Sequence, residues 1–180
     1  MKIMFDAQYR YFGRHAYRAY LLTSYFEKDK KSKLFERNID LLINAPLIGF
    51  LYGRRADVNN DKKPDTDEVY KQNVMGDRVM MSAEDLMINY RLIMLLDEEN
   101  EPDLTNRINK AFRESGKNEK DEERFYSYFR GGIDVLYEKL IEGASTPDDY
   151  INRLYDFLTE FDSRFNENVS SEHILELSNR

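Results

Sequence analysis

Two segments of the chain carry apolar side chains around most of a helical circumference, and they constrain the fold more than any other feature. One is the second half of a predicted helix over residues 33–52, and the other is a predicted helix over residues 84–99. A helix that is apolar on most sides has to be covered by other elements, so we expect both at the centre of the domain. The first stretch contains Asn44 and Pro46 and is too short to cross a hydrocarbon layer of roughly 30 Å. We therefore expect no membrane contact.

The other predicted helices follow from apolar residues that recur at steps of three and four. They cover residues 6–28, residues 103–115, residues 119–142 and a last segment that begins at residues 145–149. The last helix carries a seam of apolar side chains with the spacing of a coiled coil: Ile151, Leu154, Leu158, Phe161 and Phe165. The short connection before it favours an antiparallel helical hairpin with the preceding helix, and no segment is a convincing strand. The predicted fold is therefore all-α, an irregular bundle of about six helices with a C-terminal antiparallel helical hairpin.

The length of 180 residues suits one domain. We expect a single helical domain over residues 1–166, in which residues 53–81 form a long polar loop, and a flexible tail over residues 167–180. The first residues lack the features of a secretory signal, and the chain has no cysteine. Both observations favour a cytoplasmic location, and the second excludes a disulfide scaffold.

Charge is unevenly distributed along the chain. Residues 1–55 contain 11 Lys and Arg against 5 Asp and Glu, a net charge of +6, whereas residues 56–180 contain 16 against 29, a net charge of −13. One interpretation is that basic helices pack beside acidic ones and neutralise them. The other is that the basic first third keeps a positive surface for an anionic partner.

The first predicted helix contains the candidate contact surface. Arg10, Arg14 and Arg18 recur every four residues and form a basic stripe, and Tyr11, Tyr17 and Tyr25 lie along or beside it. Arginines interleaved with tyrosines suit an acidic groove on a protein, or the phosphates and bases of a nucleic acid. Both interpretations require guanidinium groups that face solvent and are not already paired with the chain's own carboxylates.

A twelve-residue segment of the predicted loop resembles an EF-hand or dockerin-like calcium loop. Its potential oxygen ligands are Asp57, Asn59, Asp61, Asp65 and Glu68, at positions one, three, five, nine and twelve. The segment departs from the pattern where the turn needs glycine, because Lys62 stands there, and Pro64 replaces the usual apolar residue. We therefore expect a solvated acidic loop and no metal ion.

Sequence motifs of enzymes are almost absent. The chain has two histidines, no Gly-x-Ser-x-Gly motif and no glycine-rich phosphate loop, so we expect neither catalysis nor a cofactor. The expected function is that of a non-catalytic helical interaction protein, a subunit or adaptor of a larger assembly that binds a protein partner through the basic and aromatic face. The alternative is a nucleic-acid-associated accessory factor of a bacterial DNA-processing or defence system. A second copy of the chain is a further candidate partner.

Overall fold

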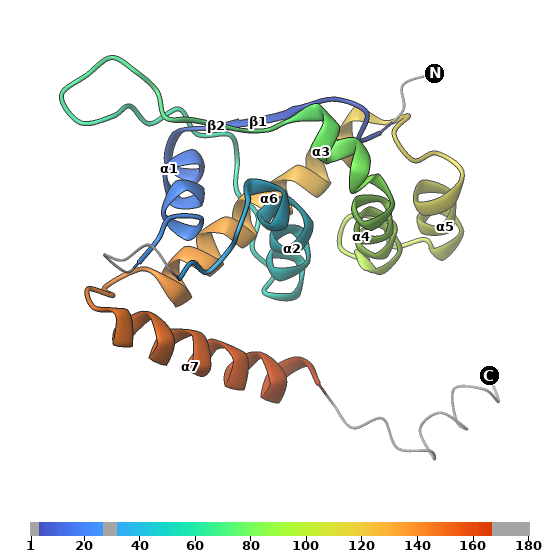
Figure 1. The fold of residues 1–180 in the computed structure, drawn as a ribbon. Helices are drawn as coiled ribbons and strands as arrows, with labels where there is room; N and C mark the ends of the chain where they lie inside the picture. Colours follow the sequence, from blue (N-terminus) through green and yellow to red (C-terminus); the bar gives the residue numbers. More distant parts are fainter. Residues whose placement is uncertain (1–3, 27–31, 167–180) are drawn as a thin grey trace.

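The computed structural model describes residues 4–26 and 32–166, which form seven helices and one two-stranded sheet (Figure 1). The protein is thus mostly helical, as predicted. The helices are α1 Gly13–Leu22, α2 Asn38–Leu51, α3 Gly76–Met81, α4 Ala83–Leu96, α5 Leu104–Phe112, α6 Glu119–Leu140 and α7 Pro147–Phe165. The strands are β1 Tyr9–Phe12 and β2 Lys71–Val74. No helix in the described ranges is long and apolar enough to span a membrane, and the predicted tail over residues 167–180 lies outside those ranges.

Helix α6 crosses α2 at direct backbone contact. A Cβ atom on Gly49 would lie 2.0 Å from the carbonyl oxygen of Tyr128, and one on Gly132 would lie 1.8 Å from that of Ala45. Glycine is therefore required on both helices, because any larger residue would push them apart. Side chains that lose all or nearly all contact with solvent surround the crossing: Leu41, Leu42, Phe129, Ile133 and Leu136.

The predicted central helix over residues 84–99 is buried on one side only. Leu86, Tyr90 and Ile93 of α4 are fully buried, as expected for a core helix. Its opposite side is open, and α5 carries a comparable apolar stripe with the same four-residue spacing. The exposed residues of these two stripes are Ile88, Leu92, Leu96, Leu104, Ile108 and Phe112.

The first predicted helix is wrong in its first half. Residues 9–12 form strand β1, and the helix begins only at Gly13, whose φ of +59° lies in the left-handed region. A Cβ atom at this position would also lie 2.1 Å from Asn59 Oδ1. Three of the four residues of β1 are aromatic, a composition that favours a strand.

The predicted loop over residues 53–81 contains two elements that the sequence did not reveal. Strand β2 pairs with β1 in antiparallel register, with Tyr9 opposite Val74 and Phe12 opposite Lys71, and helix α3 follows it. Val74 is the only fully buried residue of β2, so the strand has no apolar alternation for a sequence pattern to detect.

Helix α7 begins as predicted but buries a different line of residues. Thr146 and Asp149 form a reciprocal capping box, and backbone hydrogen bonds from Ser145 and Thr146 lower the pKa of Asp149 to about 2. Phe157 is the buried residue of α7, whereas Ile151, Leu154 and Leu158 are exposed. The seam is therefore only partly covered: Phe161 and Phe165 are half-buried, and Phe157 and Phe165 reach the ring of Tyr52.

Replacing Gly132 by alanine should lower the free energy of unfolding by about 2 kcal/mol, although alanine favours helix by about 1 kcal/mol. The loss arises because the new Cβ meets the carbonyl of Ala45 and separates α2 from α6. Urea denaturation measures the change. The control is Gly53→Ala, where φ is +60° but no atom lies within 4 Å, so only a backbone cost of about 1 kcal/mol applies. Equal losses in the two variants would contradict the helix contact.

Candidate functional site

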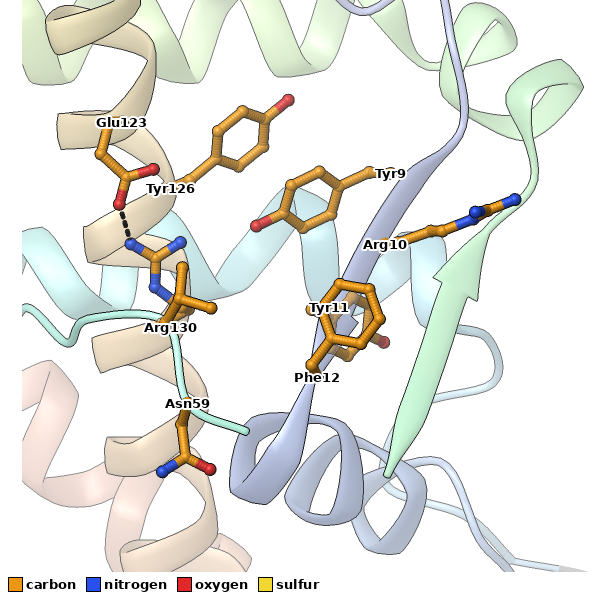
Figure 2. A pocket seen from close by; sticks show the side chains of 9 residues that line it. Tyr9, Arg10, Tyr11, Phe12, Asn59, Glu123, Tyr126 and Arg130 are labelled. Carbon is orange, nitrogen blue, oxygen red and sulfur yellow. Dashed lines mark hydrogen bonds and ion pairs between the residues drawn. The ribbon is translucent and has the colours of Figure 1, made fainter. Parts of the chain in front are cut away.

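A cleft lies between β1 and α6, on the side of β1 that faces away from β2 (Figure 2). Its volume is about 180 Å³. Four consecutive residues of β1 form one wall, α6 forms the opposite wall, and the segment that follows α2 closes one end. The lining residues are Tyr9, Arg10, Tyr11, Phe12, Val58, Asn59, Glu123, Tyr126 and Arg130.

The strand register leaves the cleft side of β1 without backbone partners. The amide of Gly13 donates to the carbonyl of Tyr70 at 2.9 Å, and Tyr11 stands two residues before Gly13, opposite Gln72. In an antiparallel pair, alternate residues bond to the neighbouring strand while the intervening ones point outward. Arg10 and Phe12 are the outward residues. Within residues 4–26 and 32–166, no group hydrogen-bonds to the backbone of Arg10 or to the N–H of Phe12 on that side, whereas the C=O of Phe12, the N-cap residue of α1, accepts the first bond of the helix.

Arg130 anchors the α6 wall and the segment that closes the cleft. Its side chain is buried, its Nε donates to the carbonyl of Ala56 at 2.7 Å, and it forms an ion pair with Glu123. The amide of Ala56 donates in turn to the carbonyl of Ser127 at 3.0 Å. The segment after α2 is therefore held against α6, and the positive charge of Arg130 is already neutralised.

Aromatic rings form the floor of the cleft. Tyr9 and Tyr126 stack with their ring centroids 4.2 Å apart and their planes 6° apart, and the rings of Tyr9 and Tyr11 both meet Phe129 edge-to-face. Burial raises the pKa of Tyr9 to about 12, although the neighbouring Arg130 acts in the opposite direction. Burial likewise raises the pKa of Tyr11 and of Tyr126. All three hydroxyls stay protonated near neutral pH.

Asn59 connects the cleft to the start of α1. Its Oδ1 accepts hydrogen bonds from the amides of Arg14, at 2.7 Å, and Asp61, at 3.0 Å. The first of these satisfies a donor in the first turn of α1 that has no partner within the helix. A residue that the sequence suggested as a calcium ligand is thus a structural cap.

The structure divides the predicted arginine stripe. Arg10 lies on β1, where it is exposed and has no ion pair with any described residue. Arg14 and Arg18 lie on α1, and both pair with Asp134 of α6, at 3.4 and 2.5 Å. Arg18 also lies over the ring of Tyr137, 4.5 Å from its centroid. Only Arg10 therefore meets the requirement for a guanidinium group that is exposed and unpaired.

The predicted tyrosines also separate. Tyr11 is 2% exposed and faces the core, because strand alternation turns it inward beside Tyr9. Its hydroxyl has no hydrogen-bond partner among the described residues. Tyr17 and Tyr25 are 39% and 47% exposed, and they lie beside Tyr70 and Lys33.

The calcium-like spacing does not gather its carboxylates. Glu68 pairs with Lys63 at 2.9 Å, and the neighbouring Asp67 pairs with Lys62 at 2.6 Å. In the part of the chain that the structure describes, no three carboxylate or imidazole groups lie close enough to hold a metal ion.

The α6 side of the cleft was not evident from the sequence. Glu123 and Arg130 are seven residues apart, which places opposite charges two turns apart on one face of a helix. That spacing is a detectable signal, but nothing local indicates that β1 lies against this face.

Comparisons of the chain with protein-family models, with curated proteins and with solved structures found no match. The function proposed below accordingly rests on the geometry of this chain alone.

Amide hydrogen exchange should reveal the open edge of β1. We expect the amides of Arg10 and Phe12 to exchange at least about tenfold faster than those of Tyr11 and Gly13, which donate to β2. Residue-resolved exchange measured by NMR tests this alternation. Uniform protection along β1 would contradict the register and show that the edge is covered.

Asp134 should stabilise the fold in a pH-dependent way. Burial acts to raise the pKa of Asp134, but hydrogen bonds and charges from His15 and Arg18 hold it below the usual value. Its contribution is therefore complete above the unfolded pKa and is lost as the pH falls through the folded pKa. Replacing Asp134 by asparagine should cost about 3 kcal/mol at pH 7, and the difference from wild type should shrink below about pH 4.

Urea denaturation at several pH values measures this effect. Glu138→Gln is the matched control, because Glu138 also lies on α6 and pairs with Arg54 at 2.9 Å, but on the surface. Its loss should stay below about 1 kcal/mol. The stabilising role of Asp134 would be contradicted if Asp134→Asn lowered the free energy of unfolding no more than the control. A loss that did not depend on pH would contradict it as well.

Proposed function

We propose that the protein is a non-catalytic interaction protein, a subunit or adaptor of a larger assembly, which binds a protein partner at the cleft beside β1. The observation that carries the proposal is the composition of this cleft. Stacked aromatic rings, the exposed Arg10 and unused backbone groups stand together there, while the buried Arg130 is already paired. Aromatic residues and arginine are the groups that contribute most to binding in protein interfaces.

The ionisation of the cleft residues favours binding over catalysis. General acid–base chemistry needs a group whose pKa lies near the working pH. Burial raises the pKa of Tyr9 to about 12, and the side chains of Arg130 and Glu123 are occupied by their ion pair. The volume of about 180 Å³ is also smaller than the roughly 300 Å³ at which small-molecule sites usually begin.

The charge distribution favours a protein over a nucleic acid. Binding to a phosphate backbone depends on several unpaired cations, each of which displaces a counterion. Arg14 and Arg18 share the carboxylate of Asp134, and the chain carries a net charge of −7. Arg10 and the neighbouring Lys71 of β2 are a small basis for phosphate binding.

Three finer points of the sequence interpretation belong to the proposal. One is a single domain over residues 1–166, which is supported by one continuous apolar core. Another is a C-terminal helical hairpin of α6 and α7, supported by the ion pair of Lys139 with Glu160 at 2.5 Å. The last is a cytoplasmic location, supported by the absence of cysteine.

Co-purification tests the proposed function. A tagged chain, expressed at its native level in its own cells, should enrich one protein in near-equimolar amount. Replacing Arg10 by glutamate should reduce that protein at least about tenfold, because the substitution reverses the charge at the cleft without touching the core. Arg113→Glu is the control, since Arg113 is an exposed arginine beyond the end of α5.

Quantitative mass spectrometry compares the three preparations, and fluorescence anisotropy with labelled single- and double-stranded DNA runs in parallel. We expect no DNA binding that weakens steeply as salt rises. Such binding, or a partner equally enriched by wild type and Arg10→Glu, would overturn the proposal.

A further inference from the structure

We propose that β1 takes up an extended segment of the partner protein as a third strand on its open edge. This inference rests on the proposed function, because it specifies how the partner binds at the same cleft. The juxtaposition that carries it is a strand with unpaired backbone groups on one side and an aromatic cleft directly beside that side (Figure 2).

The backbone of β1 offers three groups to such a segment. They are the N–H and C=O groups of Arg10 and the N–H group of Phe12, which point away from β2 because Tyr9 and Tyr11 are the residues in the bonded positions. The C=O group of Phe12, the N-cap residue of α1, accepts the first hydrogen bond of that helix. Unpaired groups of this kind on an edge strand are a template for pairing with another chain. Main-chain hydrogen bonds then supply affinity, and side-chain pockets supply specificity.

The opposite edge of the sheet is less open. Asn38, at the start of α2, places its Nδ2 3.5 Å from the carbonyl oxygen of Asn73 and 3.2 Å from Oε1 of Gln72. One side-chain donor of α2 thus lies against the outer side of β2, whereas no side chain is bound to the outer backbone groups of β1 in the described ranges.

The cleft matches the side chain of an added strand. Successive side chains of a strand point to opposite faces, so those on the Tyr9 face would enter the space between β1 and α6. The rings of Tyr9 and Tyr126 line that space, and its volume is about 180 Å³. We therefore assign an apolar or aromatic residue to the inward position of the bound segment.

The outward side chains of the added strand would lie on the same face of the sheet as Arg10, whose side chain extends toward β2 in the structure (Figure 2). This guanidinium group is exposed and has no carboxylate partner in the described part of the chain, whereas the second arginine of the cleft, Arg130, is paired with Glu123. Opposite charges across neighbouring strands stabilise the pair. The bound segment should therefore carry an aspartate or glutamate beside its inward apolar residue, in simple alternation.

A lone segment fits this edge better than a second copy. The edge is recessed beside α6 and the segment around Val58, which line the far side of the cleft. A second copy would bring its own α6 against the same space, and the two helices would compete for it. An extended peptide has no such flanking structure.

The probe is a displayed library of random linear peptides of 12 residues, selected on the immobilised full chain. We expect the enriched peptides to alternate apolar and acidic residues. Synthetic versions of one such peptide, each N-methylated at a single residue, are then titrated by fluorescence anisotropy. N-methylation removes one donor, so affinity should fall at least about tenfold at every second position and change little at the positions between.

A variant of the protein tests the same bonds from the other side. Replacing Arg10 by proline removes one of the two outward N–H groups of β1 and leaves the bonds to β2 in place, a substitution that edge strands tolerate. Arg10→Ala is the matched control, because it removes the same side chain but keeps the N–H group. Peptide affinity should be at least about tenfold lower for Arg10→Pro than for Arg10→Ala. If Arg10→Pro does not fold by circular dichroism, the N-methylation series decides alone.

The outcomes separate this inference from the proposed function. Equal peptide affinity for Arg10→Pro and Arg10→Ala would overturn strand addition. So would a fall in affinity that does not occur at every second N-methylated position of the peptide. The co-purification result could still hold, in which case the partner binds the cleft in another way. No enriched peptide, or enrichment with a helical period of three to four, would likewise overturn the inference. A concentration-dependent dimer seen by analytical ultracentrifugation and abolished by Arg10→Pro would assign the edge to a second copy and overturn it too.

Discussion

The close contact of α2 with α6 is the constraint around which the core and one wall of the cleft are built. Gly49 and Gly132 let the two backbones touch, and the neighbouring Gly131 does the same for the chain that leaves α2. A Cβ atom on Gly131 would lie 2.0 Å from the carbonyl oxygen of Arg54. The segment after α2 therefore runs flat across α6 and becomes the end wall of the cleft. Three glycines that allow close backbone packing in the core therefore also determine the shape of a surface site.

A second constraint fixes α1 and the strand before it. Asp134 is buried on α6, where it forms ion pairs with Arg14 and Arg18 of α1 and lies 3.4 Å from Nε2 of His15. Breaking such a buried cluster by removing one partner leaves uncompensated charge, which is costly. The cluster thus holds α1 against α6. The positive φ of Gly13 allows the chain to turn from β1 into α1 at that point. Arg14 and Arg18, which the sequence suggested as contacts for a partner, instead hold α1 in position. They thereby fix the place of β1, which carries the proposed binding edge.

The sequence predicted the helices best where periodicity and capping agreed. The N-terminal cap of α7, with Thr146 and Asp149, and the extent of α6 are close to what the pattern implies. The two strands were missed for a physical reason: each is four residues long, and β2 has one fully buried residue, so neither has enough alternation to be recognised. Of the predicted contact residues, Arg10 and Tyr11 line the cleft, and Asn59 lines it although it was suggested as a calcium ligand. The rest of the cleft depends on residues far apart in sequence, such as Tyr9 and Tyr126, which no local pattern relates.

The way the chain returns to the sheet has an evolutionary consequence. Asn59 accepts a hydrogen bond from the first turn of α1, and the carbonyl of Tyr70 accepts one from Gly13. The loop between Asn59 and Tyr70 therefore begins and ends at almost the same place. Between these anchors it is joined to itself by an isolated bridge of Lys62 with Val69 and touches the cleft nowhere. Insertions and deletions in residues 62–69 should thus be the first length changes to accumulate in this lineage, and they would leave the geometry around β1 intact.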